Sequence, residues 1–405
     1  MYKLIPTHQS YHWGKTGDQS EVAALINNQG IQVDAAARYA ELWMGAHVKS
    51  PSTFIENGKP SKTLYQIHPE LKYLLKVLSV DTALSIQAHP NKSHAEKLHA
   101  ARPDIYKDPN HKPEMCIALT PFEGLCGFRN FEEISNFLSK IPSLVKICQK
   151  AKIDNSNDLK IAFGNLMKAD AELVASELAQ TVKEIAENDS ELLGDLLHRL
   201  NKQYPGDVGV FCIYFLNRVL LQVGECMFLS ANVPHAYLDG NCVECMACSD
   251  NVVRAGLTPK LRDVPTLVDM LDYQPSSAEE RKFKPENAKL AKGGLSLKNY
   301  ITEIPDFLVQ KISPEEMEVD ITETLLENVT ESECIYLCTQ GSCDISAPLD
   351  GSNENSSSYE NFEKVNQLNR GSVVFTPKNY GQVKISNWSK DFVLWRASSN
   401  FMTKK

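Results

Sequence analysis

No stretch of this sequence has the roughly 18 apolar residues that a membrane-spanning helix needs. The nearest, 209–221, is shorter and contains Asn217 and Arg218. Positive charge is also in deficit, because 42 Lys and Arg against 51 Asp and Glu leave a net charge of -9. This balance excludes broad binding to nucleic acid or to an anionic membrane. A P-loop and a dinucleotide-binding glycine pattern are absent, so no nucleotide cofactor is expected.

The start of the chain, 1–17, lacks the apolar segment of a secretory signal and the Arg and Ser bias of a transit peptide. We therefore expect a cytoplasmic protein. The eleven cysteines are odd in number and irregularly spaced, which is typical of reduced thiols. Cys242, Cys245 and Cys248 have a spacing found in metal sites, but no second pair follows them. Buried thiols of a β core are the favoured interpretation.

Strand patterns dominate both ends of the chain, and a helical block lies between them. Segments such as 71–89, 225–237 and 333–340 are apolar or β-branched and are separated by Gly, Asn, Ser and Pro clusters, which predicts a β-sandwich or jelly-roll barrel. Within the block, Val174 and Leu178 recur at helical spacing. The expected fold class is therefore mainly β with a helical insert, that is, jelly-roll β-sandwich domains plus an α-helical domain.

We expect a catalytic domain from 1–129 and 204–270, a helical insert domain at 130–203, and a C-terminal jelly-roll-like domain at 271–405. Inside the insert, Asp189 and Ser190 are candidate N-caps of the last helix. The polar, Ser/Asn-rich segment 351–364 predicts a mobile loop.

Polar residues with metal-ligand chemistry occur at three separate places. Gln87 and His89 end a strand pattern, and residues i and i+2 of a strand point to the same face, so both side chains can converge. Glu114 lies in the segment His-Lys-Pro-Glu, and His235 follows a proline after another strand. Spacing alone does not show that these groups meet, and an isolated Gln-x-His pair is more often solvated or hydrogen-bonded. His94 and His99 follow Pro90 in a polar, helix-like stretch and are interpreted as surface residues.

Long motifs carry a resemblance to a known family. The segments KVLSVDTALSIQAHPNK, HKPEM with GLCGFR, and FLSANVPHAYLDGNCVECMACSDNVVRAGLTPK resemble the type I phosphomannose isomerases, specifically their eukaryotic branch. The similarity runs from about residue 11 to residue 271, and the C-terminal third is less diagnostic. Val48 and Ala83 stand where that family has Pro, and neither departure replaces a chemical group.

The resemblance implies a cupin-like fold and one Zn²⁺ per chain, held by Gln87, His89, Glu114 and His235. One carboxylate and three neutral donors leave a net charge near +1 on the ion, which suits an open, Lewis-acidic catalytic site rather than a closed structural one. The implied reaction interconverts mannose 6-phosphate and fructose 6-phosphate through a cis-enediol(ate). Its product feeds the synthesis of GDP-mannose and glycosylation precursors.

The resemblance also points to Arg254 as a catalytic residue, whose guanidinium holds phosphate or stabilises the enediolate. A structural ion pair with Asp250 is the alternative. The proton-transferring base is left open among Lys112, His111, Asp250 and Glu244.

For the substrate we expect Lys76 and Lys260 as partners of the phosphate, and Tyr237 as a residue that lines the same mouth. The expected partner is a small sugar phosphate, with no nucleic acid and no membrane, and the chain is expected to be a monomer. Three alternatives stay open: a cupin-type isomerase of glucose 6-phosphate, an iron dioxygenase, for which Gln87 is a poor ligand, and a non-catalytic sugar-binding cupin.

Overall fold

The computed structural model describes residues 1–288, 294–315, 323–326, 332–348 and 362–404. The chain divides into two compact units. Unit 1 contains Met1–Ser79, Val243–Cys248 and Lys284–Lys405, and unit 2 contains Val80–Cys242 and Ser249–Phe283. Each unit is described by itself. In the described residues no helix is long and apolar enough to cross a membrane.

Unit 2 is built on short antiparallel strands. They are β9 (Ile86–Ala88), β10 (Glu114–Ala118), β11 (Phe122–Phe128), β12 (Leu216–Leu221), β13 (Cys226–Leu229), the beginning of β14 (His235–Ala247), β15 (Val253–Gly256) and β16 (Lys282–Phe283). β10 pairs with β13, and β11 lies between β12 and β14. β9 lies between β14 and β15. The residues of β10 and β11 are all buried, which agrees with their nearly continuous apolar sequence.

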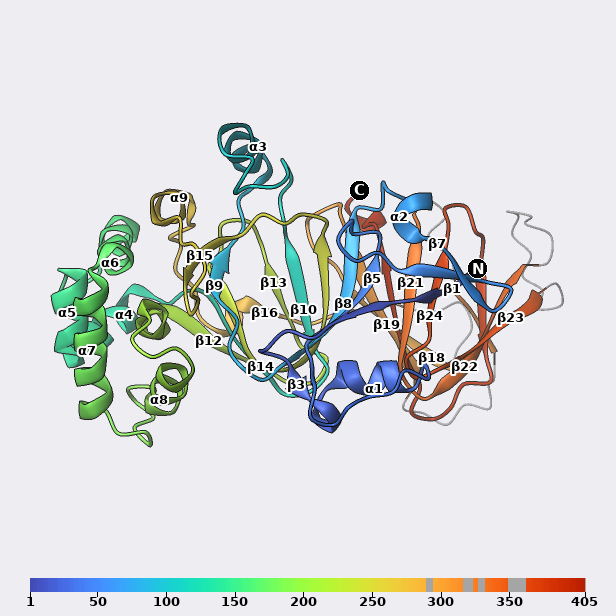
Figure 1. Cartoon of the computed structure of the whole chain (residues 1–405), viewed down its shortest axis with the longest axis horizontal. Coiled ribbons are helices and arrows are strands. Elements are labelled where there is room, and N and C mark those ends of the chain that lie inside the picture. The colour runs from blue at the N-terminus through green and yellow to red at the C-terminus, as the bar shows by residue number, and fades with distance from the viewer. Residues whose placement is uncertain (289–293, 316–322, 327–331, 349–361, 405) are drawn as a thin grey trace. The chain divides into compact units, whose positions relative to one another are not determined.

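The helices of unit 2 are α3 (Lys92–Ala101), α4 (Phe131–Lys140), α5 (Pro142–Cys148), α6 (Ser156–Lys168), α7 (Ala171–Glu184), α8 (Gly194–Gln203) and α9 (Val264–Met270), with 3-10 turns η2 (Val208–Tyr214) and η3 (Glu279–Arg281). Helices α4 to α8 gather in one group (Figure 1). Side-chain caps begin two of them, because Asn155 and Asp170 accept hydrogen bonds from the first free N–H groups of α6 and α7. Buried Phe163 and Phe215 belong to the apolar core that joins this group to the strands.

Unit 1 consists mostly of strands. They are β1 (Tyr2–Ile5), β2 (Thr7–Gln9), β3 (Lys15–Thr16), β4 (Arg38–Tyr39), β5 (Glu41–Gly45), β6 (Thr53–Glu56), β7 (Lys59–Thr63), β8 (Tyr73–Val80), β17 (Glu286–Ala288), β18 (Leu295–Tyr300), β19 (Leu308–Pro314), β20 (Glu323–Leu326), β21 (Cys334–Gln340), β22 (Ser342–Pro348), β23 (Phe362–Asn369), β24 (Val373–Thr376), β25 (Val383–Ser386) and β26 (Val393–Ser398). Its short helices are η1 (Gly17–Gln19), α1 (Glu21–Asn27), α2 (Leu64–Ile67) and η5 (Phe401–Lys404).

Two sheets organise the C-terminal part of unit 1. The larger has the strand order β17-β18-β19-β26-β21-β24-β1-β6-β7, and the smaller has the order β20-β25-β22-β23. The N-terminal strand β1 therefore pairs with β24 from near the end of the chain. Elsewhere in the unit, β5 lies between β2 and β8. Side chains such as Tyr336, Phe392 and Leu394 fill the core of this part.

The expected fold class, mainly β with a helical insert, agrees with this architecture. The three domain boundaries given above stay a prediction. Of the segment 351–364, residues 351–361 lie outside the described residues, and the remainder belongs to β23. The expected N-cap of α8 is wrong: the cap is Leu193, whose φ is 54°, and the Asp189 side chain instead accepts a hydrogen bond from the N–H of Leu192 in the preceding turn.

Candidate metal centre

Three buried side chains of unit 2 converge at strand ends. His89 follows the last residue of β9, Glu114 is the first residue of β10, and His235 is the first residue of β14. Their ligand atoms all lie within 4.8 Å of one another, and all three residues are buried. Pro90 and Pro234 border the two histidines, which agrees with strands that end or begin there.

The hydrogen-bond pattern of this cluster fits a metal ion. Glu114 Oε2 lies 3.4 Å from His89 Nε2 and 3.4 Å from His235 Nε2. Both Nε2 atoms are buried and have no hydrogen-bond partner. The Nδ1 atoms contact main-chain carbonyls, of Asn251 at 2.6 Å and of Val233 at 2.9 Å. An Nδ1–H that donates to a carbonyl leaves Nε2 as an unprotonated lone pair, which is the usual arrangement of metal-binding histidines.

The electrostatics keep these ligands in their metal-binding forms. Burial lowers the pKa of His89 to about 4, so the imidazole is neutral at neutral pH. Burial alone would raise the pKa of Glu114, but its neighbours, Lys112 foremost, outweigh it and hold the pKa well below the usual range. The ammonium of Lys112 lies 2.5 Å from Glu114 Oε1, opposite the oxygen that faces the histidines.

Gln87 lies in the same row of the sheet as one of these ligands and as Arg254. On antiparallel strands it is directly opposite His235 of β14 on one side and opposite Arg254 of β15 on the other. Directly opposite residues project to the same face, with Cβ atoms about 5 Å apart. The Gln87 Oε1 accepts a hydrogen bond from the Ser85 hydroxyl at 3.3 Å. The register thus brings the predicted fourth ligand and the predicted catalytic arginine together.

Arg254 is half-buried, and burial lowers the pKa of its guanidinium. Burial is the cause of this shift, and the structural ion pair with Asp250 stays the alternative to a catalytic role. Close backbone contact sets the position of β15. A Cβ atom on Gly256 would meet the Gly209 Cα at 2.5 Å, so the chain needs glycine there. The Asp207 carboxylate accepts the N–H of Gly209 at 2.6 Å and of Leu257 at 2.7 Å, which joins η2 to the end of β15.

The other residues of unit 2 that were predicted to be catalytic or substrate-binding differ in burial and in their contacts. His111 and Lys112 precede Glu114, and the ammonium of Lys112 contacts its carboxylate. The ring of Tyr237 is buried and packs edge-on against Phe122, with centroids 5.4 Å apart. Lys260 is exposed in the segment after β15. The backbone N–H of Asp250 donates to the Asp108 carboxylate at 2.8 Å.

Two further predicted residues, Lys76 and Glu244, form a buried charge cluster within unit 1. The ammonium of Lys76 lies 3.0 Å from Glu244 Oε2 and 3.5 Å from Glu41 Oε2. It also lies 4.9 Å above the ring of Trp43, its direct partner across β5 and β8, and the Trp43 indole N–H donates to Glu41. Sequence reasoning missed Glu41 and Trp43, although both lie in the motif ELWMGAH, one of the stretches that supported the resemblance.

The cysteines and the two histidines that we considered as other metal ligands form no metal cluster in the described part of the chain. None of the eleven cysteines forms a disulfide; Cys242 and Cys245 are fully buried and Cys248 is partly buried, as expected of thiols in a β core. His94 and His99 are half-buried on α3, and the His99 Nδ1 contacts the carbonyl of Tyr106 at 2.7 Å.

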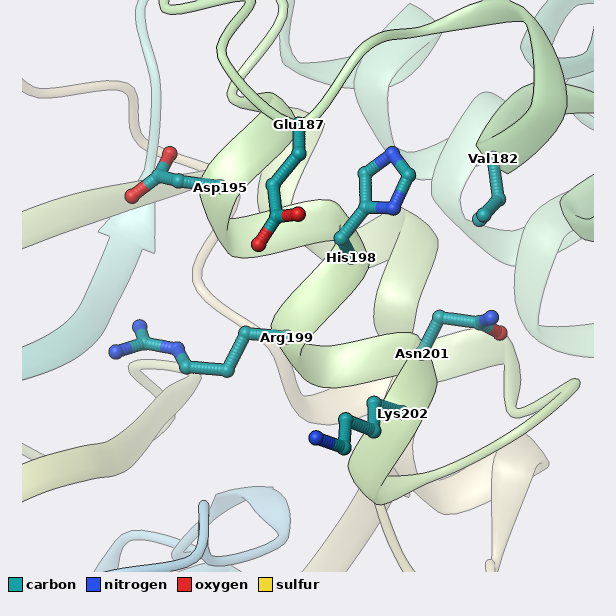
Figure 2. A pocket seen from close by; sticks show the side chains of 7 residues that line it. All are labelled: Val182, Glu187, Asp195, His198, Arg199, Asn201 and Lys202. Carbon is teal, nitrogen blue, oxygen red and sulfur yellow. The ribbon is translucent and has the colours of Figure 1, made fainter.

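Two other polar features occur in the described residues. In unit 1, His68, Glu70 and Glu333 have ligand atoms within 4.8 Å, but the ammonium of Lys378 already lies 3.7 Å from the Glu333 carboxylate. In unit 2, a hollow of about 630 Å³ lies beside α8 (Figure 2). Its lining residues are Val182, Glu187, Asp195, His198, Arg199, Asn201 and Lys202. Two of them are engaged in ion pairs, since Arg199 contacts Glu123 and Asp195 contacts Arg218, so the buried cluster at the strand ends is the better candidate site.

A β framework with a helical insert and a buried two-histidine, one-glutamate cluster defines a metal-binding protein of catalytic type. The model of the phosphomannose isomerase type I catalytic domain matches residues 1–131, and that of the helical insertion domain matches residues 137–216. The mannose-6-phosphate isomerases of Bos taurus and Homo sapiens are each 42% identical to the chain, over 98% of it and 98% of their own length.

Solved structures agree. A mutant of phosphomannose isomerase from Salmonella typhimurium superposes with a TM-score of 0.81 at 29% identity, covering 99% of this chain and 100% of that one. A mannose 6-phosphate isomerase bound with zinc and yttrium superposes with a TM-score of 0.80 at 29% identity and the same coverage. The chain therefore belongs to the type I phosphomannose isomerase family and is an enzyme. The resemblance and the fold class inferred from the sequence are thereby confirmed.

Proposed function

We propose that this enzyme is a zinc-dependent isomerase that interconverts mannose 6-phosphate and fructose 6-phosphate through a cis-enediol intermediate. The observation that carries the proposal is the pair of buried, unpartnered Nε2 atoms of His89 and His235, each 3.4 Å from the same oxygen of Glu114. Two neutral imidazoles and one carboxylate are typical protein ligands of Zn²⁺, and one ion per chain is the stoichiometry that one such cluster gives.

His89, Glu114 and His235 would hold the ion, with Gln87 as the fourth ligand. When bound, Zn²⁺ supplies a Lewis acid that polarises the sugar carbonyl. The single carboxylate among these ligands leaves the site with net positive charge. Lys112 adds to that charge, because it lies against the outer oxygen of Glu114 and is buried with it.

Arg254 is the residue of the chain best suited to an anionic substrate. Its guanidinium stays protonated and is half-buried. Arg254 lies directly across from Gln87, and the strand that carries Gln87 separates it from His235. A guanidinium can form paired hydrogen bonds to a phosphate or to the oxygen that gains charge as the C1–C2 proton leaves. We propose that Arg254 binds either the phosphate of the substrate or the oxygen that becomes negatively charged during proton transfer.

For the proton transfer, we propose a base among His111, Lys112, Asp250 and Glu244. For substrate binding we propose Lys76, Tyr237 and Lys260. In unit 1, the contact between Lys76 and Glu244 makes these two a matched proton donor and acceptor. Glu41 shares the same ammonium, so carboxylates that can accept hydrogen bonds from sugar hydroxyls lie on both sides of Lys76.

The experiment combines substrate conversion with metal analysis. Purified enzyme loaded with one equivalent of Zn²⁺ is given mannose 6-phosphate, glucose 6-phosphate or unphosphorylated mannose, and each product is identified. We expect fructose 6-phosphate from mannose 6-phosphate alone, loss of activity with EDTA, and recovery with Zn²⁺. Full zinc occupancy without turnover of any sugar phosphate contradicts the proposal and favours a non-catalytic cupin, whereas turnover of glucose 6-phosphate alone favours the related isomerase.

We further propose a catalytic jelly-roll domain at 1–129 and 204–270, a helical insert at 130–203 and a C-terminal jelly-roll-like domain at 271–405. We also propose that the enzyme works as a monomer in the cytoplasm, where its product enters the synthesis of GDP-mannose. Sedimentation of the purified protein and fractionation of its native cells test the last two statements.

A further inference from the structure

We propose that Asp108 and Asn251 are positioning residues that hold the ligands of the metal centre at binding distance. Neither touches the expected position of the ion. Their hydrogen bonds join the segment that carries Glu114 to the turn at 249–251. The carbonyl of Asn251 in that turn orients His89. The inference rests on the proposed zinc site, and it concerns the affinity of that site rather than the reaction catalysed there.

Asp108 is the centre of a compact hydrogen-bond network. Its Oδ1 accepts the N–H of Asn110 at 2.9 Å and the hydroxyl of Ser249 at 2.8 Å. Its Oδ2 accepts the N–H of Asp250 at 2.8 Å. The Asp108 carboxylate thus holds together the turn at 108–110 and the turn at 249–251, which lies more than 140 positions away in sequence. An ionised acceptor forms stronger hydrogen bonds than a neutral one, so this connection is firm.

Asn251 is fully enclosed and makes the connection rigid. It is 1% exposed, and its amide nitrogen donates to the carbonyls of Asp108 at 2.6 Å and Asn110 at 2.9 Å. The main-chain carbonyl of the same residue is the acceptor for His89 Nδ1 at 2.6 Å. The side chain of Asn251 therefore holds in place the group that fixes the tautomer and the ring orientation of His89.

The network spans two of the three ligand-bearing segments. Six positions after Asp108, the same segment reaches Glu114, whose Oε2 lies 3.4 Å from the His89 Nε2. A shift of the 249–251 turn would move the ring of His89 relative to Glu114. Zinc tolerates only small errors in ligand distance, and changes in residues that orient its ligands usually cost about 10- to 100-fold in metal affinity or activity.

The experiment compares Asn251→Ala with a matched control, Asn217→Ala. Asn217 is also 1% exposed, lies in unit 2, and donates its amide to main-chain carbonyls, most closely those of Phe128 and Ser276 at 3.0 Å each. Zinc affinity is measured by competition with a chromophoric chelator, stability by thermal unfolding of the zinc-loaded and zinc-free proteins, and ligand geometry by the absorption spectrum of the Co²⁺-substituted proteins.

We expect Asn251→Ala to bind zinc about 10- to 100-fold more weakly and to shift the Co²⁺ spectrum, whereas Asn217→Ala lowers the unfolding temperature but leaves both metal readouts unchanged. Asp108→Asn should also weaken zinc binding, because an amide nitrogen, which cannot accept a hydrogen bond, replaces one of the two carboxylate oxygens that accept them. Wild-type zinc affinity and spectrum in both Asn251→Ala and Asp108→Asn overturn the inference. Tight zinc binding by the wild type without isomerase activity overturns the proposed function instead and leaves the positioning roles testable.

Discussion

Gln87 and Arg254 are direct partners on the antiparallel strands β9 and β15. His235 faces Gln87 from the other side, so an imidazole, an amide and a guanidinium form one row across three strands. The row places a permanent cation next to the cluster of His89, Glu114 and His235. Its geometry is fixed by main-chain pairing, and it is the feature from which the effects of mutation follow most directly.

Replacing Arg254 with Ala should leave zinc binding unchanged and lower kcat/KM by a factor of about 100 or more, the usual cost of losing one strong donor to developing charge. Arg254→Lys should recover only part of this loss, because an ammonium lacks the planar pair of donors. Steady-state kinetics with zinc analysis of the same samples test this. A variant that loses its metal or its fold, with normal turnover per bound zinc, contradicts the catalytic role.

Replacing His235 with Ala should remove zinc and activity together, because it removes one of the three ligands that converge at the strand ends. His94→Ala on α3 is the control, since that histidine is not part of the cluster. Metal content after dialysis and the rate of mannose 6-phosphate conversion are the measurements. Stoichiometric zinc in His235→Ala would show that the ion is held elsewhere.

Lys112→Met should destabilise the zinc-free protein by about 3–5 kcal/mol, because it leaves the buried carboxylate of Glu114 without its cation. In the wild type Lys112 helps to keep the pKa of Glu114 low; in the variant, burial should raise this pKa. Zinc is expected to compensate for most of this loss, so the zinc-loaded variant should unfold close to the wild type. Urea unfolding with and without zinc tests the difference, and an equal loss in both states contradicts it.

Lys76→Met should destabilise unit 1 strongly, by about 3 kcal/mol, because the buried carboxylates of Glu41 and Glu244 then lose the ammonium that they share. Lys59→Met is the matched control, since Lys59 is exposed on β7. Its effect should stay within about 0.5 kcal/mol. Denaturant unfolding measures both, and equal effects would show that the cluster contributes no stability.

Gly256→Ala should lower both stability and turnover, because a Cβ atom at this position meets the backbone of Gly209 at 2.5 Å. Backbone atoms cannot move aside as a side chain can, so β15 must shift and carry Arg254 with it. Gly30→Ala is the control for a glycine with open space around it, although its positive φ of 82° adds some strain there. Unchanged kcat in Gly256→Ala would show that the position of β15 is not critical.

Much of the fold could be predicted from local pattern, because apolar periodicity and breakers act over a few residues. The segment 71–89 forms β8 and β9 as expected, and 241–248 proves to be the second half of the long strand β14. The error at Asp189 has a local cause. The N-cap of α8 is Leu193, which has a positive φ and makes no side-chain cap hydrogen bond, so no capping residue in the sequence marks the start of the helix at Gly194.

The site was less accessible to sequence reasoning. Strand parity relates Gln87 to His89, but the convergence of Glu114 and His235 depends on the pairing of distant strands, and only the family resemblance joined them. Asp108 and Asn251 carry no signal of their own, because an Asp before Pro and an Asn after Asp are common in turns. Their role follows only from contacts between segments more than 140 positions apart.

The acceptors that orient His89 and His235, the two histidines of the candidate metal centre, are main-chain carbonyls, not side chains. A carbonyl is present whatever amino acid occupies positions 233 and 251, so no point mutation can delete either acceptor. A mutation at these positions can change the imidazole tautomers only by moving the backbone. Selection at this centre should therefore act on residues that set the backbone conformation, such as Pro234 and Asn232 with its φ of 67°, as much as on the ligands themselves.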